Sequence, residues 1–160
     1  MIGGKMPLAR PRFKLRTLML WVGAAALASA WLRTVLYPAP PVAAVAGPTF
    51  HFGTMPQRVT GRHAYTVKND GGKPLRLSFE QSTVGMYSVY AWVGGKKHIL
   101  IRDGAVTVGP GQSVRIFMEW ETRSNDGWFV KGANLATNDP DRPSVALNVV
   151  GTVTPAGGKR

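Results

Sequence analysis

The sequence of 160 residues predicts an all-β domain, a two-sheet sandwich of seven to eight strands, behind one N-terminal transmembrane helix. Two observations lead to this prediction. An uncharged apolar run, Leu18–Leu32, follows a basic N-terminus. From residue 49 onward, short runs of alternating apolar and polar residues are separated by glycine-rich turns, a texture that is typical of β-sandwiches.

The apolar run decides where the domain is delivered. Only basic charges precede it, in the predicted cytoplasmic segment 1–17, and no acidic residue occurs before Asp70. This asymmetry places the N-terminus in the cytoplasm and the C-terminal domain in the periplasm. Two interpretations stay open. As a retained anchor, Leu18–Tyr37 is a helix of about 30 Å, which spans the hydrocarbon core. As a signal peptide, the chain is cleaved near Ala30, after the small residues Ala28-Ser29-Ala30.

The remaining chain divides into a linker, a domain and a tail. Residues 38–48 contain four prolines among small apolar residues, which predicts a semi-rigid extended spacer. Residues 49–153 form the predicted sandwich, and residues 154–160 form a tail. No stretch with the helical period is found after Pro38. The alternation predicts strands at residues 49–52, 63–68, 75–80, 86–93, 98–102, 114–120, 128–136 and 144–153.

Composition excludes several classes of function. The chain contains no cysteine, which excludes disulfides, thiol nucleophiles and thiolate metal sites. Six of the 20 basic residues lie at or before Arg33, whereas all eight acidic residues follow it. The predicted exported part is therefore only mildly basic, with both signs interleaved, so we expect a soluble surface and not a nucleic-acid interface.

The order of several short motifs resembles one known family. They are Phe50-x-Phe52-Gly53, Tyr65-x-Val67-x-Asn69-x-Gly71, Pro74-Leu75, Gly109-Pro110-Gly111, Gly127 leading to Thr137-Asn138-Asp139-Pro140, and a closing Leu147–Gly151 strand. Residues 49–153 thus resemble the bacterial domain of unknown function numbered fifteen-seventy-three, an immunoglobulin-like module similar to the sandwiches of major sperm protein and of ciliary and centrosomal scaffold proteins. The resemblance implies an immunoglobulin-like sandwich that mediates interactions.

Two further points qualify the resemblance. Many members carry a Cys-Gly-Cys-like motif where this chain reads Ser82-Thr83-Val84-Gly85-Met86, so no redox or metal role carries over. The run from Arg12 to Leu18 is similar to a leader of planctomycete-type envelope proteins, which usually precedes a membrane helix.

Most chemically suggestive residues are better assigned to structure. The histidines lack zinc-site spacing, so we expect no metal site. Glu119 and Glu121 share one strand face with Arg115 and Arg123, which predicts a solvated ion-pair ladder and not an acid–base pair. The run from Asn138 to Asp141 is typical of an Asx turn before a proline, in preference to a calcium site. The histidines are His51, His63 and His98.

The candidate partner surface is the basic, aromatic hairpin over residues 86–102. Cations beside aromatic rings suit an anionic polymer, although a charged hairpin also discourages edge pairing. We therefore expect a membrane-anchored, non-enzymatic interaction module exposed to the periplasm, without a cofactor or small-molecule substrate, whose partner is another envelope protein or an anionic polymer. The alternative is a secreted domain that binds an anionic envelope polymer after cleavage near Ala30. The surface consists of Tyr87, Tyr90, Trp92, Lys96, Lys97, His98 and Arg102.

Overall fold

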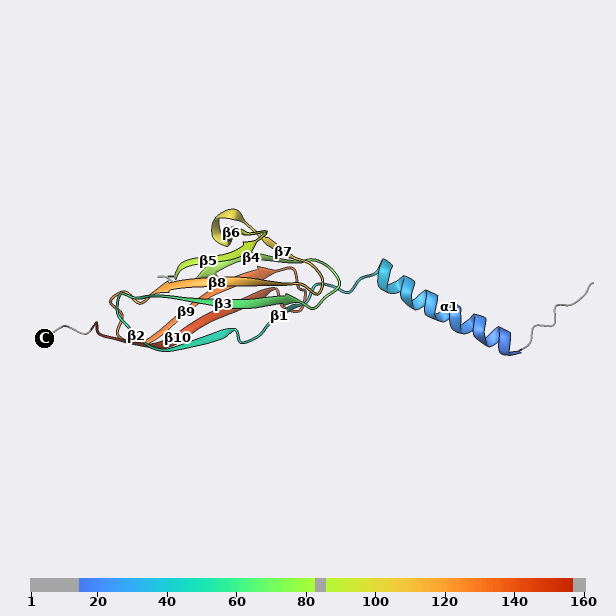
Figure 1. Cartoon of the computed structure of the whole chain (residues 1–160), viewed down its shortest axis with the longest axis horizontal. Helices are drawn as coiled ribbons and strands as arrows, with labels where there is room; N and C mark the ends of the chain where they lie inside the picture. The colour runs from blue at the N-terminus through green and yellow to red at the C-terminus, as the bar shows by residue number, and fades with distance from the viewer. Residues whose placement is uncertain (1–14, 83–85, 157–160) are drawn as a thin grey trace, which may run out of the picture. The chain divides into compact units, whose positions relative to one another are not determined.

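The computed structural model describes residues 15–82 and 86–156, without the side chains of residues 15–18, 34, 86 and 87. Most of the predicted cytoplasmic segment 1–17, most of the tail 154–160, and residues 83–85 of the stretch that replaces the cysteine motif lie outside the described residues. The chain divides into two units, the first ending at Pro38 and the second beginning at Ala39. Figure 1 shows the helix of the first unit and the β-sandwich of the second.

The first unit contains helix α1, Leu15–Leu36. Its alanine- and leucine-rich sequence favours the helix, and the helix ends shortly before Pro38, because proline disfavours helical backbone in the residue that precedes it. Its described apolar side chains, including Trp21, Leu27 and Trp31, are exposed. Within residues 15–82 and 86–156, no helix is both long enough and apolar enough to cross a membrane.

The second unit consists of two five-stranded sheets (Figure 1). Sheet A has the order β1 (Ala43–Val45), β3 (Thr60–Asn69), β8 (Ser113–Glu121), β5 (Met86–Val93) and β6 (Lys96–Ile99), with every neighbouring pair antiparallel. Sheet B has the order β2 (Thr49–Pro56), β10 (Ser144–Thr154), β9 (Gly127–Thr137), β4 (Leu75–Ser82) and β7 (Val106–Val108), antiparallel except for β2 beside β10. The predicted all-β, two-sheet sandwich is confirmed.

The core follows from the alternation of side chains along each strand. On β8, Ile116, Met118 and Trp120 are buried between the sheets, whereas Phe117 and Glu119 lie on the opposite face. Strands of both sheets contribute in the same way, because successive side chains of a strand point to opposite faces. The sandwich therefore has one internal face per sheet, and the two outer faces remain for solvent or partners.

The prediction of an extended spacer at residues 38–48 is corrected by the structure. Ala43–Val45 is strand β1 and pairs with β3, and Pro41 and Ala43 are buried. The segment docks because two buried side chains bind its backbone: Asn69 Oδ1 accepts a hydrogen bond from the Val42 amide, and Asp139 Oδ2 accepts one from the Ala43 amide at 2.8 Å. Most of the proline-rich run therefore belongs to the second unit.

The predicted strand at residues 98–102 is also wrong. Strand β6 ends at Ile99, and residues Leu100–Asp103 form the helical turn α2. The Asp103 carboxylate accepts a hydrogen bond from the Ile99 amide at 2.7 Å, which holds this turn closed, and Leu100 is buried in the core. The described residues form ten strands and not seven or eight, because the three-residue strands β1 and β7 are too short to show an alternation pattern.

Candidate functional site

The residues of the predicted partner surface separate into exposed and buried groups. Trp92 is 53% exposed, and it pairs across the β5–β6 hairpin with Lys97, so both side chains project from the outer face of sheet A. Lys96 and Arg102 are exposed on the hairpin and on α2. His98 is half-buried, with Nε2 3.3 Å from the carbonyl oxygen of Gly104. The Tyr87 side chain lies outside the described residues.

Tyr90, one of the residues of the predicted partner surface, is covered by its neighbours. It is only 3% exposed, although it lies on the outer face of sheet A. Its ring stacks on Phe117 with centroids 5.1 Å apart, Lys97 Nζ lies 3.8 Å above the ring, and its hydroxyl donates to Glu119 Oε1 at 3.0 Å. Burial and the hydrogen bond to Glu119 raise the pKa of Tyr90. Phe117 and Lys97 therefore cover the Tyr90 ring, and the cation–π contact with this ring positions the Lys97 ammonium group.

Three residues that were not predicted for this surface widen it. Phe117 pairs with Tyr90 across β8 and β5, and the guanidinium carbons of Arg62 and Arg115 each lie 5.9 Å from the Phe117 ring centroid. Phe117 could have been identified from the sequence, because the alternation along β8 places it on the outer face of the sheet. An aromatic ring on an outer face is a candidate contact for a partner. No local sequence pattern could place Arg62 beside Phe117, because β3 and β8 are distant in sequence.

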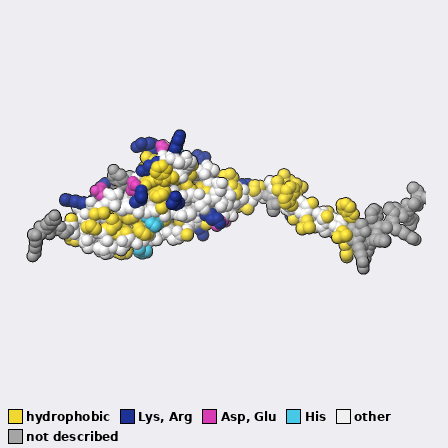
Figure 2. All heavy atoms as spheres, in the orientation of Figure 1, with side chains coloured by type: hydrophobic (Ala, Val, Ile, Leu, Met, Phe, Trp, Pro, Cys, Tyr) yellow, Lys and Arg dark blue, Asp and Glu magenta, His cyan; other side chains and the backbone are white. Residues whose placement is uncertain are grey.

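We call this surface the cationic aromatic face. Its cations are exposed, whereas the neighbouring carboxylate of Glu119 is half-buried and accepts the Tyr90 hydroxyl. Figure 2 shows hydrophobic and Lys or Arg side chains gathered together on this part of the domain. Guanidinium and ammonium groups over ring faces are electrostatically favourable, and both remain available to an anion. The face consists of Arg62, Tyr90, Trp92, Lys97, Arg115 and Phe117.

An unpaired strand edge borders the face. β1 covers only Val67–Asn69 of β3. The Asn69 amide donates to Gln112 O, beside β8, and the Asp70 amide donates to Val42 O, beside β1. Backbone groups alternate sides along a strand, so even-numbered residues of β3 face away from β8. From Thr60 to Thr66 these groups have no strand partner among the described residues, and such an edge accepts an extended segment.

The other candidate residues have structural partners. The His63 ring stacks on Phe50 with centroids 3.8 Å apart, and burial lowers its pKa. Glu121 lies 3.6 Å from Arg123, as the predicted ladder requires, whereas Glu119 binds Tyr90 instead. Among the side chains that the structure describes, no group of three or more histidine or acidic residues is placed to hold a metal ion.

The Asn138–Asp141 segment is a turn whose side-chain oxygens accept backbone hydrogen bonds. Asn138 Oδ1 accepts from the Arg76 amide at 2.7 Å, and Asp139 Oδ1 accepts from the Asp141 amide at 2.9 Å. Burial by itself raises the pKa of Asp139, but hydrogen bonds from backbone amides, that of Ala43 first, and the charge of Arg142 outweigh it, so the pKa is lowered. Asp139 is therefore an ionised structural clamp.

Comparisons with known proteins identify no family. No protein-family model matches the sequence, and there is no match among the curated proteins. Similar solved structures include a protein of unknown function from Porphyromonas gingivalis W83, with 15% identity over 70% of this chain and 46% of that chain and a TM-score of 0.49. A human PapD-like domain, domain 7 of CEP192, has 8% identity over 72% of this chain and 87% of that chain and a TM-score of 0.48.

A third similar structure is the YadV chaperone, with 14% identity over 74% of this chain and 54% of that chain and a TM-score of 0.42. The chain thus spans less than half of the Porphyromonas protein. At these identities and scores, the fold rests on the strand pairing described above. The resemblance to the domain-of-unknown-function family stays a prediction.

Proposed function

We propose that this protein is a non-enzymatic, immunoglobulin-like interaction module that binds an anionic partner through the cationic aromatic face. One observation carries the proposal: three cations from three different strands converge on one stacked aromatic pair. Arg62, Arg115 and Lys97 come from β3, β8 and β6 and lie over the rings of Phe117 and Tyr90. An aromatic platform orients these charges in advance, so less side-chain entropy is lost when an anionic polymer binds.

The test is salt-dependent binding of the full-length protein to alginate, a polyuronate, with neutral dextran as the reference polymer. We expect binding to alginate that weakens steeply from 0.05 to 0.5 M salt, because the ions screen charges at the surface. The double variant Lys97→Gln/Arg115→Gln should lose at least tenfold in affinity. The matched control, Lys73→Gln/Arg76→Gln, removes the same charge from exposed positions outside the face. Equal losses in both variants would reduce the effect to net charge and contradict the proposal.

The open edge of β3 favours a second candidate function, the capture of an extended protein segment by strand addition. Ala64 offers a selective test, because its amide faces the open edge and not β8. Proline at this position removes a donor to an added strand and leaves the β8 pairing intact. We expect Ala64→Pro to abolish photo-crosslinking from Thr66 to an envelope protein in intact cells. Persistence of that crosslink would exclude strand addition at this edge.

We further propose that residues 18–37 attach the domain to the inner membrane with the domain in the periplasm. The basic residues before the apolar run and the exposed apolar side chains of α1 support this proposal. Fractionation of the native protein, with determination of its mature N-terminus, is the test. An intact chain in the membrane fraction is the expected result. A soluble chain that begins after Ala30 would favour the secreted alternative.

A further inference from the structure

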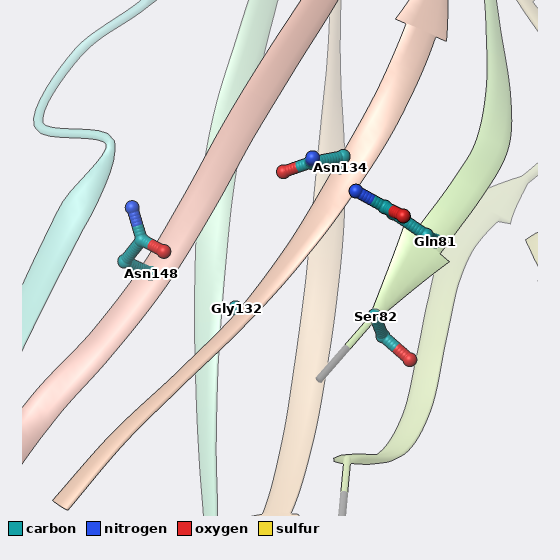
Figure 3. A pocket seen from close by; sticks show the side chains of 5 residues that line it. All are labelled: Gln81, Ser82, Gly132, Asn134 and Asn148. Atoms are coloured by element: carbon teal, nitrogen blue, oxygen red, sulfur yellow. The ribbon is translucent and has the colours of Figure 1, made fainter. Parts of the chain in front are cut away.

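A polar hollow lies on the outer face of sheet B, on the other sheet from the cationic aromatic face. Its volume is about 260 Å³. Figure 3 shows the side chains that line it, which come from the neighbouring strands β4, β9 and β10. Asn134 is the register partner of Gln81, and Gly132 is the register partner of Asn148. The lining residues are Gln81, Ser82, Gly132, Asn134 and Asn148.

Gly132 allows the Asn148 side chain to lie over β9 in the lining of the hollow. It occupies an outward position of β9, between the buried residues of the core face. A Cβ atom added there would overlap Asn148 Oδ1 and would lie 3.2 Å from the carbonyl oxygen of Leu147. The Gly132 backbone is not in the left-handed region, so conformational need does not explain this glycine. The Asn148 side chain, which lies over this position and leaves no room for a Cβ, does explain it.

The chemistry of the lining is that of neutral hydrogen bonding. Three of the five lining residues carry a carboxamide, which offers an N–H₂ donor and a carbonyl acceptor. In the described structure, the side-chain amides of Gln81, Asn134 and Asn148 form no hydrogen bond with the protein. Among the described residues, no ionisable side chain lines the hollow. A ligand that supplies paired donors and acceptors without charge matches this lining, and the hydroxyl groups of a sugar do so.

Two observations favour a saccharide over an extended peptide. β9 is a central strand, paired on one side with β10 and on the other with β4, so its backbone has no free edge to offer a peptide. Trp128 lies on the same face of β9, 70% exposed, and Val130 stands exposed between it and Gly132. Trp128 and Gly132 are about 13 Å apart along the strand, at about 3.3 Å per residue. An indole ring can stack on the C–H face of a pyranose. The carboxamides of the hollow can bind the hydroxyl groups of a second sugar unit.

We propose that this hollow and Trp128 form a binding site for a neutral oligosaccharide, with one sugar in the hollow and a later unit of the same chain on the indole. This site is independent of the proposed anionic partner, because it lies on the other sheet. Gln81, Asn134 and Asn148 select the hydroxyl pattern, and Trp128 adds apolar contact. A charged sugar gains no ion pair from this lining, since the described lining residues carry no charge.

The test uses the full-length protein in a detergent without a sugar headgroup, titrated with hexasaccharides of glucose, mannose, xylose and N-acetylglucosamine. We expect at least one hexasaccharide to shift the side-chain NH₂ resonances of Asn134 and Asn148. Gly132→Ala should weaken this binding at least tenfold, because the added Cβ would displace the Asn148 side chain from its place in the lining. Trp128→Ala should weaken it several-fold. Trp92→Ala is the matched control, an exposed tryptophan on sheet A, and should leave the affinity unchanged.

The wild-type resonances keep the test decisive even if Gly132→Ala fails to fold. Absence of binding by all four hexasaccharides at 10 mM would overturn the proposal. The same holds if the shifted resonances lie outside β4, β9 and β10, or if Trp92→Ala weakens binding as much as Trp128→Ala. Failure here leaves alginate binding by sheet A untouched, so the two sites are judged separately.

Discussion

Replacing Asp139 by asparagine tests how the proline-rich segment is fixed to the domain. Asp139 is 2% exposed, and its two carboxylate oxygens accept the amides of Ala43 at 2.8 Å and Asp141 at 2.9 Å. Asparagine keeps the shape and one acceptor oxygen, but it turns an N–H₂ group toward one of the two amide donors. One charge-assisted hydrogen bond is therefore lost, and one donor is left facing another donor.

The magnitude follows from these contacts. A hydrogen bond to a charged group contributes about 1.5–3 kcal/mol, and an unsatisfied buried donor costs a similar amount. We expect Asp139→Asn to lower the free energy of unfolding by about 2–3 kcal/mol at pH 7, a fall in Tm on the order of 10 °C for a domain of this size. Asp141→Asn is the matched control, since Asp141 is exposed, and we expect it to change Tm by about 1 °C or less.

The contribution of Asp139 to stability should depend on pH, and the direction of its pKa shift gives the sign of that dependence. The pKa of Asp139 is lowered in the folded protein, so this carboxylate stabilises the fold above its ordinary value of 3.8 and loses that contribution as the pH falls below it. Thermal unfolding followed by circular dichroism at pH 7 and at pH 2–3 measures both effects. The difference between wild type and Asp139→Asn should shrink in acid. A variant as stable as Asp141→Asn at pH 7 would refute the clamp.

Two other predictions concern stability. Gly71→Ala should destabilise the domain by about 1–3 kcal/mol and expose residues 39–45 to limited proteolysis, because its Cβ would overlap Pro40 O and lie 2.6 Å from Val42 N, which are backbone atoms; an unchanged proteolysis pattern would contradict the docking of this segment. Burial raises the pKa of Tyr65 to about 12, so stability should decline as the pH rises from 10 toward 12. Tyr65→Phe should remove that decline in alkaline unfolding curves, and a decline of equal size in the variant would assign it to another group.

The sandwich was predictable because one alternation runs through each long strand. The odd-numbered pattern of Tyr65 and Val67 and the even-numbered pattern of Ile116 and Met118 identify the core faces without any knowledge of pairing. Short strands could not be predicted, because three residues are too few to show an alternation. β1 has three residues, and hydrogen bonds to the side chains of Asn69 and Asp139 hold it in place. No local sequence pattern predicts these long-range contacts.

The candidate site was only half predictable, because the local hairpin supplies one part of it. Trp92 and Lys97 face each other across one turn, and both were predicted to lie on the hairpin surface. Arg62 and Arg115 reach the same surface only through the order of strands in sheet A, which depends on long-range pairing. Burial of Tyr90 was unpredictable for the same reason, since Phe117 covers it from another strand.

The central claim is that the cationic aromatic face binds an anionic partner, and amide chemical-shift mapping tests it most directly. The full-length ¹⁵N-labelled protein would be titrated with alginate oligomers at low salt. We predict that the largest shifts fall on Arg62, Trp92, Lys97, Arg115 and Phe117 and disappear at 0.5 M salt. Shifts spread evenly over all exposed lysines and arginines, or confined to sheet B, would contradict the account.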